Sequence, residues 1–600
     1  MCGIAGCVGL RGAPAAVKEA LAALEYRGYD SCGVAWSKDG KLSVVRAVGP
    51  VAGLTVPADA ATVALGHTRW ATHGGVTEAN AHPHRDCKGD VAVVHNGILS
   101  NHEALRRNLE AKGHRFASAT DSEALAHLWE DAAGDGFARL AAVKAHLQGT
   151  YSIAVLDRRE GALVFAKERN PLWVAVGPSG AWLASDPVAL RPHAKEAVPL
   201  EDGDVGRLTA TGFEIRDAAG RPTQRKAYPL AALDERAGKA GYEHFMLKEI
   251  HEAPAALNRL VAAHVRPQAP YVRLGVPPAF LGQARRVLAL GAGTSHHAAQ
   301  LSALWLQRLA KIPAEAKATP EYKDDPQVPE VGTLLVAFSQ SGETLDTLQA
   351  LHRLRGHPTP TLAFTNQPAS SLARQAEHAV PLLAGTEVSV AATKTFLAQA
   401  LLGFLLALEK GAAEGSLGDA ELAVHADRLR VLPRLVERTL LRSSTLASAA
   451  RRLAEAENVF VLAKGLLVPL ASEGALKLKE IAYQHAEAYP AGELKHGPFA
   501  LLSSATPVVF LLAPGASEEA VRNAIHEVAA RGAPVHVLAL DNANVAGIAK
   551  DSLTLLPEAP NELAPFVFAS ALHLLAYWTA KARALPIDRP RNLAKSVTVE

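Results

Sequence analysis

Cysteine and methionine are scarce in this chain, which has four cysteines and two methionines among its 600 residues. The cysteines are Cys2, Cys7, Cys32 and Cys87. A chain of this length does not need disulfides to fold, so we interpret all four as free thiols. It also exceeds what a single hydrophobic core supports, and several domains are therefore expected.

An excess of charge of either sign is also absent, because 62 Lys and Arg are balanced by 60 Asp and Glu. Proteins that bind nucleic acid through its phosphates need a basic surface. We therefore expect no nucleic-acid partner, and any phosphate that binds must be held locally. The hydrophobic share of 49% is that of an ordinary globular chain.

Long apolar runs are missing as well. The longest candidate, residues 395–408, is interrupted by Gln399 and predicts a buried helix rather than a span of the bilayer. The opening residues MCGIAGCVGLRG lack the basic start and apolar run of a signal peptide. We therefore expect no membrane partner and a cytoplasmic location.

The first part of the chain, residues 1–235, contains short β-rich runs such as DVAVVHNG and YSIAVLD between a few helical segments. This pattern predicts a sheet-dominated α/β domain. Its chemistry begins at Cys2. If Met1 is removed, Cys2 carries both a thiol and a free α-amine, and an amine with a pKa of about 7.7–8.0 is a suitable base for the thiol. A cysteine seen alone is more often a small buried residue.

Cys2 is followed by three clusters and one acidic residue: residues 25–33 (EYRGYDSCG), 66–74 (GHTRWATHG), 95–103 (HNGILSNHE) and Asp121. With these motifs the domain resembles the class II glutamine amidotransferases. The resemblance implies an N-terminal nucleophile (Ntn) αββα fold. It also makes Cys2 the nucleophile that attacks the side-chain amide of glutamine and releases ammonia.

The resemblance implies the groups around the nucleophile. Asn96 and the backbone N–H of Gly97 would form the oxyanion hole, where donors stabilise charge that develops in the transition state. Arg69 and Asp121 would hold the α-carboxylate and α-ammonium groups of glutamine. One cation and one anion are what a zwitterion requires.

The resemblance adds four residues to the glutamine site, namely Arg27, Trp70, Thr72 and His73. Arg27 would lie near the nucleophile, and Trp70 would gate the passage of ammonia, although a Trp after a strand is more often part of a core. The spacing of His73, His82 and His84 is not a zinc pattern. We expect these histidines to be satisfied or adjacent to substrate, and we expect no metal site.

The first domain is predicted to end in residues 217–243, which are polar and contain prolines and glycines. A linker and a leading helix are expected at residues 236–280. From about residue 285 the pattern changes to a strand, a turn rich in glycine or serine, and a long helix. This pattern predicts doubly wound parallel sheets, so the whole chain is expected to be a multi-domain α/β protein.

The second half of the chain repeats itself. A shift of 172 residues brings Val287 onto Val459, and a shift of 173 brings Leu335 onto Val508. We infer two copies of one domain. The predicted boundaries are residues 281–425 and 450–590 for the two copies and 591–600 for a C-terminal tail.

Hydroxyl groups follow two consecutive strands of the first copy. At a helix N-terminus such groups suit phosphate, whereas a single Ser or Thr there is more often an N-cap. Two such loops favour a ligand, and their glycines match neither a dinucleotide fingerprint nor a P-loop. The residues are Thr294, Ser295, Ser339, Gln340, Ser341 and Thr344.

The second copy lacks these hydroxyls in its second loop and is rich in titratable groups instead. Glu473, Lys477 and Glu480 lie at helical offsets of four and three and share one helix face, and His496 follows them. Judged by charge alone, this face is a solvated one.

The two copies resemble sugar isomerase (SIS) domains, and the whole chain resembles the glutamine–fructose-6-phosphate aminotransferases. The resemblance implies L-glutamine and fructose 6-phosphate as substrates, with ammonia passing internally to the sugar to give glucosamine 6-phosphate. The hydroxyl-bearing loops and Val390 would bind the sugar phosphate. A homodimer is expected, because paired SIS domains commonly share sites. No cofactor is expected, because an iminium acidifies the neighbouring carbon by itself.

Three catalytic groups of the second half follow from the same resemblance. Lys595 would form a Schiff base with the sugar ketone, His496 would open the ring, and Glu480 would move a proton between carbons one and two. Seen alone, the tail that carries Lys595 is of the kind that usually frays. Ala392 stands where the family commonly has a serine that contacts the sugar, so it is left out of the site.

Two other functions stay open at this point. One is a regulatory sensor of sugar phosphates with an inactive amidotransferase attached, and the joint presence of Cys2, Glu480, His496 and Lys595 argues against it. The other is a glutaminase that acts alone, which would release glutamate at a rate indifferent to the sugar.

Overall fold

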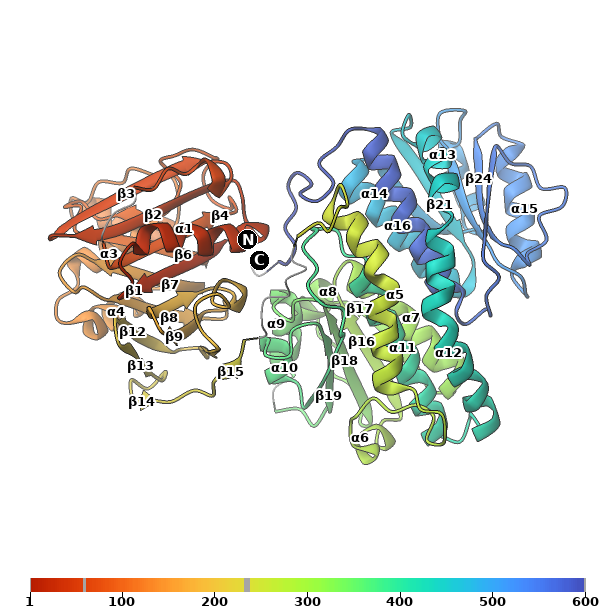
Figure 1. Ribbon diagram of the computed structural model, residues 1–600, viewed down its shortest axis with the longest axis horizontal. Coiled ribbons are helices and arrows are strands. Elements are labelled where there is room, and N and C mark those ends of the chain that lie inside the picture. Colours follow the sequence, from red (N-terminus) through yellow and green to blue (C-terminus); the bar gives the residue numbers. More distant parts are fainter. Residues whose placement is uncertain (1, 58–60, 231–237, 355, 598–600) are drawn as a thin grey trace. The chain divides into compact units, whose positions relative to one another are not determined.

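The structure is a computed structural model that describes residues 2–57, 61–230, 238–354 and 356–597. The chain forms two compact units (Figure 1). Unit 1 comprises residues 1–237 with 596–600, and unit 2 comprises residues 238–595.

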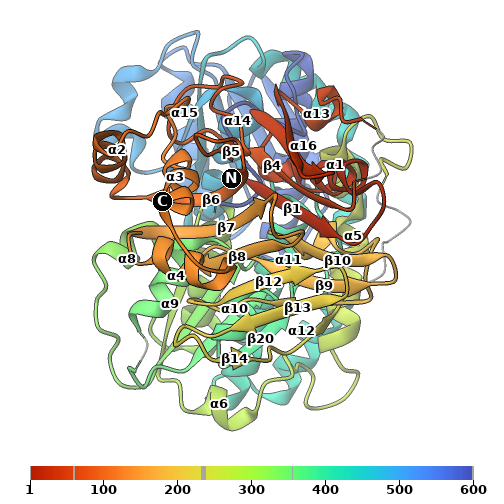
Figure 2. The ribbon, with the colours of Figure 1, turned by 90° about the vertical axis from the view of Figure 1, so that its left-hand side faces the viewer.

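Unit 1 is built on two antiparallel sheets. Their strand orders are β15-β11-β9-β10-β1-β4-β2-β3 and β14-β13-β12-β8-β7-β6-β5, and Figure 2 shows β7, β8, β12 and β13 following one another across the second sheet. The first sheet contains β1 (Gly3–Val8), β2 (Ser31–Lys38), β3 (Lys41–Val48), β4 (Val63–Arg69), β9 (Trp173–Gly177), β10 (Gly180–Ala184), β11 (Glu196–Pro199) and β15 (Tyr228–Pro229). The second contains β5 (His84–Arg85), β6 (Val91–Leu99), β7 (Gly149–Asp157), β8 (Leu163–Glu168), β12 (Val205–Thr209), β13 (Gly212–Arg216) and β14 (Pro222–Thr223).

A hydrophobic core lies between the two sheets. Side chains alternate along a strand, so one face of each sheet supplies this core. Ile4 and Leu65 come from the first sheet, Leu156 and Phe165 come from the second, and all four are fully buried. Helix α1 covers the outside of the first sheet, and α2, α3 and α4 cover the second. These helices are α1 (Ala13–Leu24), α2 (His102–Ala111), α3 (Glu123–Asp131) and α4 (Gly136–Lys144). The predicted αββα layering is confirmed.

Unit 2 contains two parallel sheets of five strands each, with the orders β17-β16-β18-β19-β20 and β22-β21-β23-β24-β25. Both follow the doubly wound order 2-1-3-4-5. The first sheet contains β16 (Arg286–Gly291), β17 (Ala314–Ala318), β18 (Thr333–Ser339), β19 (Thr361–Thr365) and β20 (His378–Pro381). The second contains β21 (Asn458–Ala463), β22 (His485–Pro490), β23 (Val508–Leu512), β24 (Val535–Leu540) and β25 (Ser552–Leu556). Since β16 corresponds to β21 and β18 to β23, the predicted repeat is confirmed.

Helices join the two sheets of unit 2 through one continuous hydrophobic core. The ring of Trp305 on α7 stacks on Phe566 of α16 with centroids 5.9 Å apart, and Phe404 of α11 lies 5.1 Å from the same indole. Helix α5 runs beside α11 and α12 (Figure 1). The helices are α5 (Phe245–His264), α6 (Pro278–Gly282), α7 (Thr294–Trp305), α8 (Thr319–Asp324), α9 (Leu345–Arg353), α10 (Ser371–Gln375), α11 (Lys394–Ala413), α12 (Asp419–Leu440), α13 (Ser443–Leu453), α14 (Val468–Ala482), α15 (Glu518–Ala529) and α16 (Ala564–Ala582).

The buried helix predicted at residues 395–408 is confirmed as α11. Within the part of the chain that the structure describes, it is the one helix that is long and apolar enough to cross a membrane. However, 89% of its apolar window is buried inside unit 2. Gln399, which interrupts the apolar run, is itself fully buried.

The stacked rings predict a large stability effect at Phe566. Phe566→Ala removes a fully buried ring from the shared core, and such a change costs about 3–5 kcal/mol of unfolding free energy. Val431 on α12 is 57% exposed, so Val431→Ala should change stability by less than about 0.5 kcal/mol. Urea unfolding followed by tryptophan fluorescence compares the two variants. Equal midpoints would contradict a core shared by the two sheets.

Candidate functional site

The first candidate site lies where the core between the sheets of unit 1 ends. The period of two that points Ile4 and Leu65 into the core also directs inward the polar residues that lie two or four positions away along the chain. These polar residues are Cys2 directly before β1, His67 and Arg69 on β4, and Asn96 on β6. The sheet alternation therefore gathers the site.

Cys2 lies at the start of β1, close to the end of β4. The backbone N–H of Trp70 donates a hydrogen bond to the Cys2 sulfur at 3.3 Å. Removal from water raises the pKa of the Cys2 thiol, whereas the Trp70 N–H and the charge of Arg69 act in the opposite direction and favour the thiolate. The α-amine expected to act as the base depends on Met1, which lies outside the described residues.

Asn96 on β6 faces Cys2 with its amide nitrogen. Nδ2 donates to the backbone carbonyl of Cys2 at 3.1 Å, and Oδ1 lies 3.1 Å from Nε2 of His67. The same Nε2 lies 3.0 Å from the carbonyl oxygen of His95. Because both partners are acceptors, Nε2 must carry the proton. Burial lowers the pKa of His67 to about 3, so the ring is neutral.

His67 is therefore a positioning residue that the sequence analysis missed, because it fixes which end of the Asn96 amide faces Cys2. A signal was present, since His67 lies two residues before Arg69 in GHTRW and shares its strand face. Gly97 follows Asn96 with a φ of 135°. A Cβ at this position would lie 1.9 Å from the carbonyl oxygen of Thr150, so only glycine fits.

Arg69 and Asp121 are both buried and fixed by local hydrogen bonds. The Arg69 guanidinium donates to the carbonyl oxygens of Gly74 and Gly75, each at 3.1 Å. The Asp121 carboxylate accepts from the N–H of Leu99 at 3.0 Å. These bonds hold one cation and one anion in place near the end of the core.

The other four residues of the predicted glutamine site lie in two places. Arg27 is buried and donates to the Cys2 carbonyl at 3.3 Å and to Asp186 at 3.1 Å. Trp70 is half-buried rather than part of the core, and its ring meets Tyr29 edge-on with centroids 6.0 Å apart. Thr72 and His73 follow on the loop whose carbonyls Arg69 binds, and their side chains lie 3.4 Å apart. Asp186, which orients Arg27, was missed from the sequence.

His82 and His84 are buried beside the site, with ring centroids 4.5 Å apart. Nε2 of His84 lies 3.0 Å from the hydroxyl of Thr120, so this histidine is satisfied as expected. The ring nitrogens of His82 have no hydrogen-bond partner among the described residues. Burial lowers the pKa of both rings, to about 3 for His84, which keeps them neutral.

The second candidate site lies in unit 2, beyond the carboxyl ends of β16 and β18. These neighbouring strands form the switch point of the first sheet, where ligands of doubly wound folds bind. Thr294 and Ser295 open α7, and Ser339 ends β18. The Ser339 hydroxyl accepts from the N–H of Gly342 at 3.0 Å and lies 3.3 Å from that of Thr344. The two predicted phosphate loops are thus adjacent.

The charged face of α14 is not solvated, so the expectation based on its charges was wrong for Glu473 and Lys477. Both side chains are fully buried. Lys477 donates to the Thr294 hydroxyl at 2.9 Å and also pairs with Glu480. Burial acts to lower the pKa of Lys477, but Glu473 and Glu480 outweigh it and raise the pKa. The lysine thus joins Glu480 to the first phosphate loop.

Glu473 is held by partners from two other helices. Nδ1 of His297 on α7 lies 2.8 Å from its Oε2, and Nε2 of His573 on α16 lies 3.5 Å from its Oε1. Burial acts to raise the pKa of Glu473, but Lys477 and the two histidines hold it well below its ordinary value. Neither histidine was singled out from the sequence, because both lie on helices far from α14 in the chain.

Lys595 is not on a frayed end, so that alternative is wrong for the described part of the tail. Its ammonium donates to Glu387, and the two side chains are 3% and 0% exposed. Glu387 also accepts from the N–H and the hydroxyl of Thr395 at 3.2 and 2.6 Å. The N–H of Val390 donates to the carbonyl of Asp588 at 3.1 Å, which joins the same loop to the chain before the tail.

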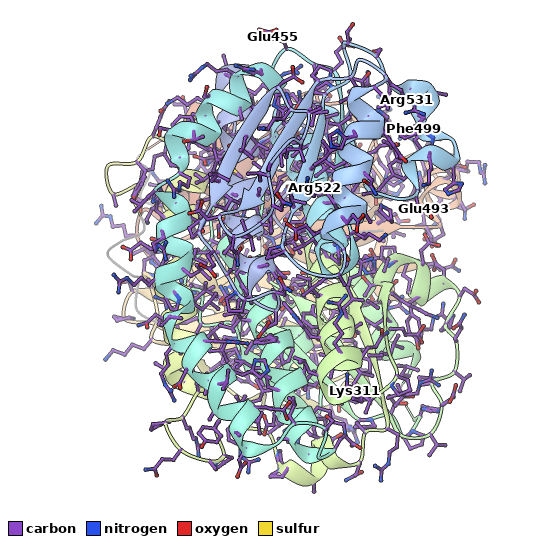
Figure 3. All side chains as sticks on the ribbon, turned by 90° about the vertical axis from the view of Figure 1, so that its right-hand side faces the viewer. Lys311, Glu455, Glu493, Phe499, Arg522 and Arg531 are labelled. Carbon is purple, nitrogen blue, oxygen red and sulfur yellow. The ribbon has the colours of Figure 1, made fainter. Side chains whose placement is uncertain are left out.

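His496 stands apart from these groups. It ends a 3₁₀ turn (Leu494–His496), is exposed, and its ring has no hydrogen bond or ion pair within the part of the chain described. The next turn is anchored by Phe499, whose ring lies 3.9 Å from the guanidinium carbon of Arg531 (Figure 3). The structure therefore does not join His496 to Lys595 or Glu480.

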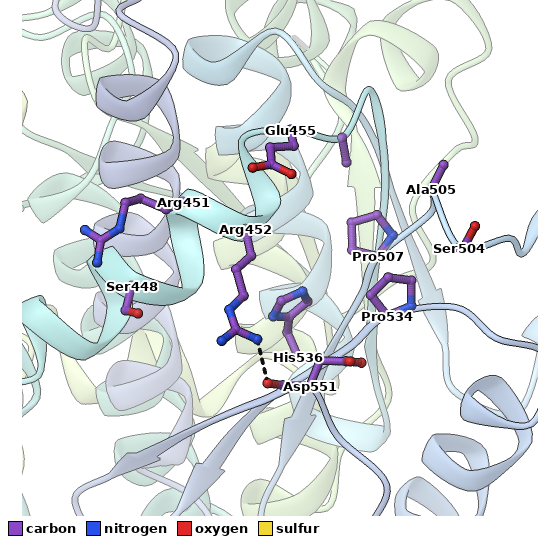
Figure 4. Close-up of a pocket in the computed structure, with 11 residues that line it drawn as sticks. Ser448, Arg451, Arg452, Glu455, Ser504, Ala505, Pro507, Pro534, His536 and Asp551 are labelled. Atoms are coloured by element: carbon purple, nitrogen blue, oxygen red, sulfur yellow. Dashed lines mark hydrogen bonds between the residues drawn. The ribbon is translucent and has the colours of Figure 1, made fainter.

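A pocket of unit 2 lies at the amino ends of three strands of the second sheet (Figure 4). Pro507, Pro534 and Asp551 line it and directly precede β23, β24 and β25. Arg452 donates to the carbonyl oxygen of Asp551 at 2.9 Å. Because ligands of doubly wound sheets bind beyond the carboxyl ends of the strands, this pocket at the amino ends is not the candidate site.

Glu249 on α5 forms a second buried carboxyl group next to Glu387. Its carboxyl accepts from the N–H groups of Val388 and Ser389. Burial and the negative charge of Glu387 raise the pKa of Glu249 to about 8. Burial also acts to raise the pKa of Glu387, but Lys595 outweighs it and holds that pKa at about 2.

This raised pKa predicts a pH dependence of stability. An unfolded glutamic acid titrates near pH ~4.3, so the folded chain keeps a proton on Glu249 that the unfolded chain loses between about 4.3 and about 8. The stabilisation is complete below this interval, falls as the pH rises through it, and is gone above about 8. The urea unfolding midpoint, measured at several pH values, should therefore fall as the pH rises through this interval. Glu249→Gln should lack this fall, and Glu437→Gln, at an exposed site on α12, should retain it. Identical slopes would contradict the assignment.

The comparisons with known proteins cover both units of the chain. Sequence profiles of the SIS domain match residues 280–409 and 452–583, and that of a glutamine amidotransferase domain matches residues 67–192. The glutamine–fructose-6-phosphate aminotransferases (isomerizing) of Halobacterium salinarum and Thermus thermophilus are each 41% identical to this chain, over 100% of both sequences. The solved C-terminal domain of glucosamine-fructose-6-phosphate aminotransferase from Francisella tularensis is 31% identical with a TM-score of 0.57, covering 59% of this chain and 100% of that domain.

These similarities cover the chain from end to end and include both kinds of domain in the same order. The chain belongs to the family of glutamine–fructose-6-phosphate aminotransferases.

Proposed function

We propose that this chain converts L-glutamine and fructose 6-phosphate into glutamate and glucosamine 6-phosphate. The observation that carries the proposal is the buried Lys595, held by Glu387 in a unit that also carries two adjacent hydroxyl-bearing loops. A sensor of sugar phosphates needs the loops but not a buried amine. Incubating the full chain with both substrates and assaying glucosamine 6-phosphate tests the proposal. Binding of the sugar without product would favour the sensor.

In the glutaminase half, the Cys2 thiolate attacks the side-chain amide of glutamine. The Asn96 amide uses one N–H on the Cys2 carbonyl, which leaves the other for the oxyanion, and the Gly97 N–H is the second donor. Arg69 and Asp121 bind the α-carboxylate and α-ammonium groups. The thioester forms as ammonia leaves, and water then hydrolyses it to glutamate. Arg27 holds the Cys2 main chain, Trp70 donates its backbone N–H to the Cys2 sulfur, and Thr72 and His73 follow on the same loop.

In the synthase half, the phosphate and nearby hydroxyls of the sugar bind to the two loops of the first sheet and to Val390. The loop residues are Thr294, Ser295, Ser339, Gln340, Ser341 and Thr344. Lys477 donates to the Thr294 hydroxyl, so this hydroxyl is fixed in orientation. The Thr294 hydroxyl in turn donates to Oε1 of Glu473 at 3.2 Å.

The chemistry then proceeds at carbons one and two of the sugar. His496 opens the ring by proton transfer, and the Lys595 amine condenses with the ketone to an iminium with loss of water. Ammonia from Cys2, transferred internally, displaces the lysine. Glu480 moves a proton from carbon one to carbon two, which converts the ketimine to the aldose. Glu480 is suited to this role because its partner Lys477 fixes the carboxylate.

Two further expectations belong to the same proposal. We propose that the chain acts as a homodimer in the cytoplasm, and light scattering of the purified chain tests the first of these. We also propose the domain boundaries predicted from the sequence, which are 1–235, 236–280, 281–425, 450–590 and 591–600.

Asn96→Ala should impair the glutaminase without unfolding the chain. Loss of one oxyanion donor costs about 10²–10³ in kcat, while the alanine leaves the strand intact. The measurement is glutamate release at saturating glutamine. Asn108→Ala, at an exposed position of α2, is the matched control and should keep the wild-type rate. A similar kcat in Asn96→Ala would remove Asn96 from the oxyanion hole.

Lys595→Ala should abolish synthesis of glucosamine 6-phosphate while glutamine hydrolysis persists, because only the sugar chemistry needs this amine. Borohydride with fructose 6-phosphate should reduce the iminium and label Lys595 in the unmodified chain, as mass spectrometry of peptides would show. Lys581→Ala, at an exposed site of α16, should be labelled and active like the wild type. Full synthesis in Lys595→Ala would overturn the Schiff-base assignment.

A further inference from the structure

A cluster of four potential metal ligands lies in unit 1, on the outer side of the second sheet. It consists of Cys87, His114, His127 and Glu130, whose ligand atoms all lie within 4.8 Å of one another. The residues come from the turn before β6, the turn after α2, and α3. The proposed glutamine chemistry uses none of them.

The distances between the ligand atoms fit one tetrahedral metal ion. Zinc bonds of about 2.3 Å to sulfur and about 2.0–2.2 Å to nitrogen and oxygen place neighbouring ligand atoms about 3.3–3.6 Å apart. The Cys87 sulfur lies 3.6 Å from Nδ1 of His114 and 3.5 Å from Nδ1 of His127. Oε2 of Glu130 lies 3.4 Å and 3.9 Å from the same two nitrogens.

The outer nitrogens of both histidines face carboxylates. Nε2 of His114 lies 2.9 Å from Oδ1 of Asp131, and Nε2 of His127 lies 3.6 Å from Oε1 of Glu123. Histidines that bind a metal usually direct the second ring nitrogen to a carboxylate or carbonyl, which fixes the tautomer and leaves Nδ1 as the ligand. His114 is fixed in this way by Asp131, whereas Nε2 of His127 lies beyond hydrogen-bond distance of Glu123 and only faces it. Both rings present Nδ1 to the same point beside the Cys87 sulfur.

Backbone groups also hold Cys87 and Glu130 in place. The backbone N–H of Arg115 donates to its sulfur at 3.4 Å, and the N–H of Cys87 donates to Glu130 at 3.1 Å. Cys87 is exposed at the surface, so an ion can enter without unfolding the domain. The thiol proton leaves to solvent when the metal binds.

We propose that Cys87, His114, His127 and Glu130 form a structural zinc site. One thiolate and one carboxylate balance the charge of a divalent ion, and a mixed sulfur, nitrogen and oxygen set in tetrahedral geometry selects Zn²⁺ over Mg²⁺ or Ca²⁺. All four positions are filled by protein, which is the arrangement of structural rather than catalytic zinc.

The site joins three segments that lead into the glutamine site. Cys87 precedes β6, which carries Asn96, and α3 begins two residues after Asp121. A bound ion therefore holds the start of β6, the turn after α2 and α3 together. This link restrains the segment that delivers Asp121, and it stabilises the folded domain because zinc binds the folded state.

The experiment uses the full chain, produced without a metal-binding tag, stripped with a chelator and titrated with ZnCl₂. The expected result is one zinc per chain by mass spectrometry of the metal, together with a higher midpoint of thermal unfolding. Cys87→Ser should lose the bound zinc and the shift. His146→Ala, an exposed histidine after α4, and Cys2→Ser should retain both.

Two further measurements separate the site from zinc bound elsewhere. Co²⁺ in place of zinc should give a thiolate charge-transfer band that Cys87→Ser lacks. Asp131→Asn leaves all four ligands and should weaken zinc binding about 10–100-fold. Zinc bound equally by the wild type and Cys87→Ser, or no zinc bound by the wild type, would overturn the proposal.

Discussion

The buried ion pair between Lys595 and Glu387 is the interaction on which the second site depends. Both side chains are removed from water, so either charge left alone would cost about 3–5 kcal/mol. Glu387 is also the acceptor for Thr393, which directly precedes α11, and for Thr395 in its first turn. The same carboxylate thus fixes the tail, the loop before α11 and the start of this buried helix. The ion pair therefore holds the Lys595 amine at one place and restricts its side-chain motion.

A second buried network joins the two halves of unit 2. Lys477 and Glu473 lie on a helix of the second SIS repeat, and they contact Thr294 and His297 on a helix of the first. The stacked rings of Trp305 and Phe566 add an apolar contact between the same two repeats. Since a half-satisfied polar network in a core is costly, the predicted phosphate loop of the first repeat is fixed by the packing of the second. The repeats therefore form one structural unit.

In unit 1 the side chains of the site are fixed by sheet geometry instead of buried charge. Strand alternation turns Cys2, His67, Arg69 and Asn96 toward one point at the end of the core. Neutral His67 then fixes the Asn96 amide, and Gly97, which has no Cβ, allows the close approach to Thr150. The site is rigid because strands, rather than loops, carry its main donors.

Much of this protein was determined by its sequence alone. Strand period and turn residues predicted a sheet-dominated first domain and parallel sheets in the second half, and the shift of 172 residues predicted that these sheets are paired. The αββα layering and the roles of Cys2, Arg69 and Asn96 were implied by the resemblance that the motifs carry. Local patterns carry such information because period and capping are short-range properties. Only the tertiary structure decided that Lys595 pairs with Glu387, 208 positions away, that the charged face of α14 is buried, and that Cys87 meets His114, His127 and Glu130. Burial and long-range proximity depend on how the elements pack, and spacing along one sequence does not encode that.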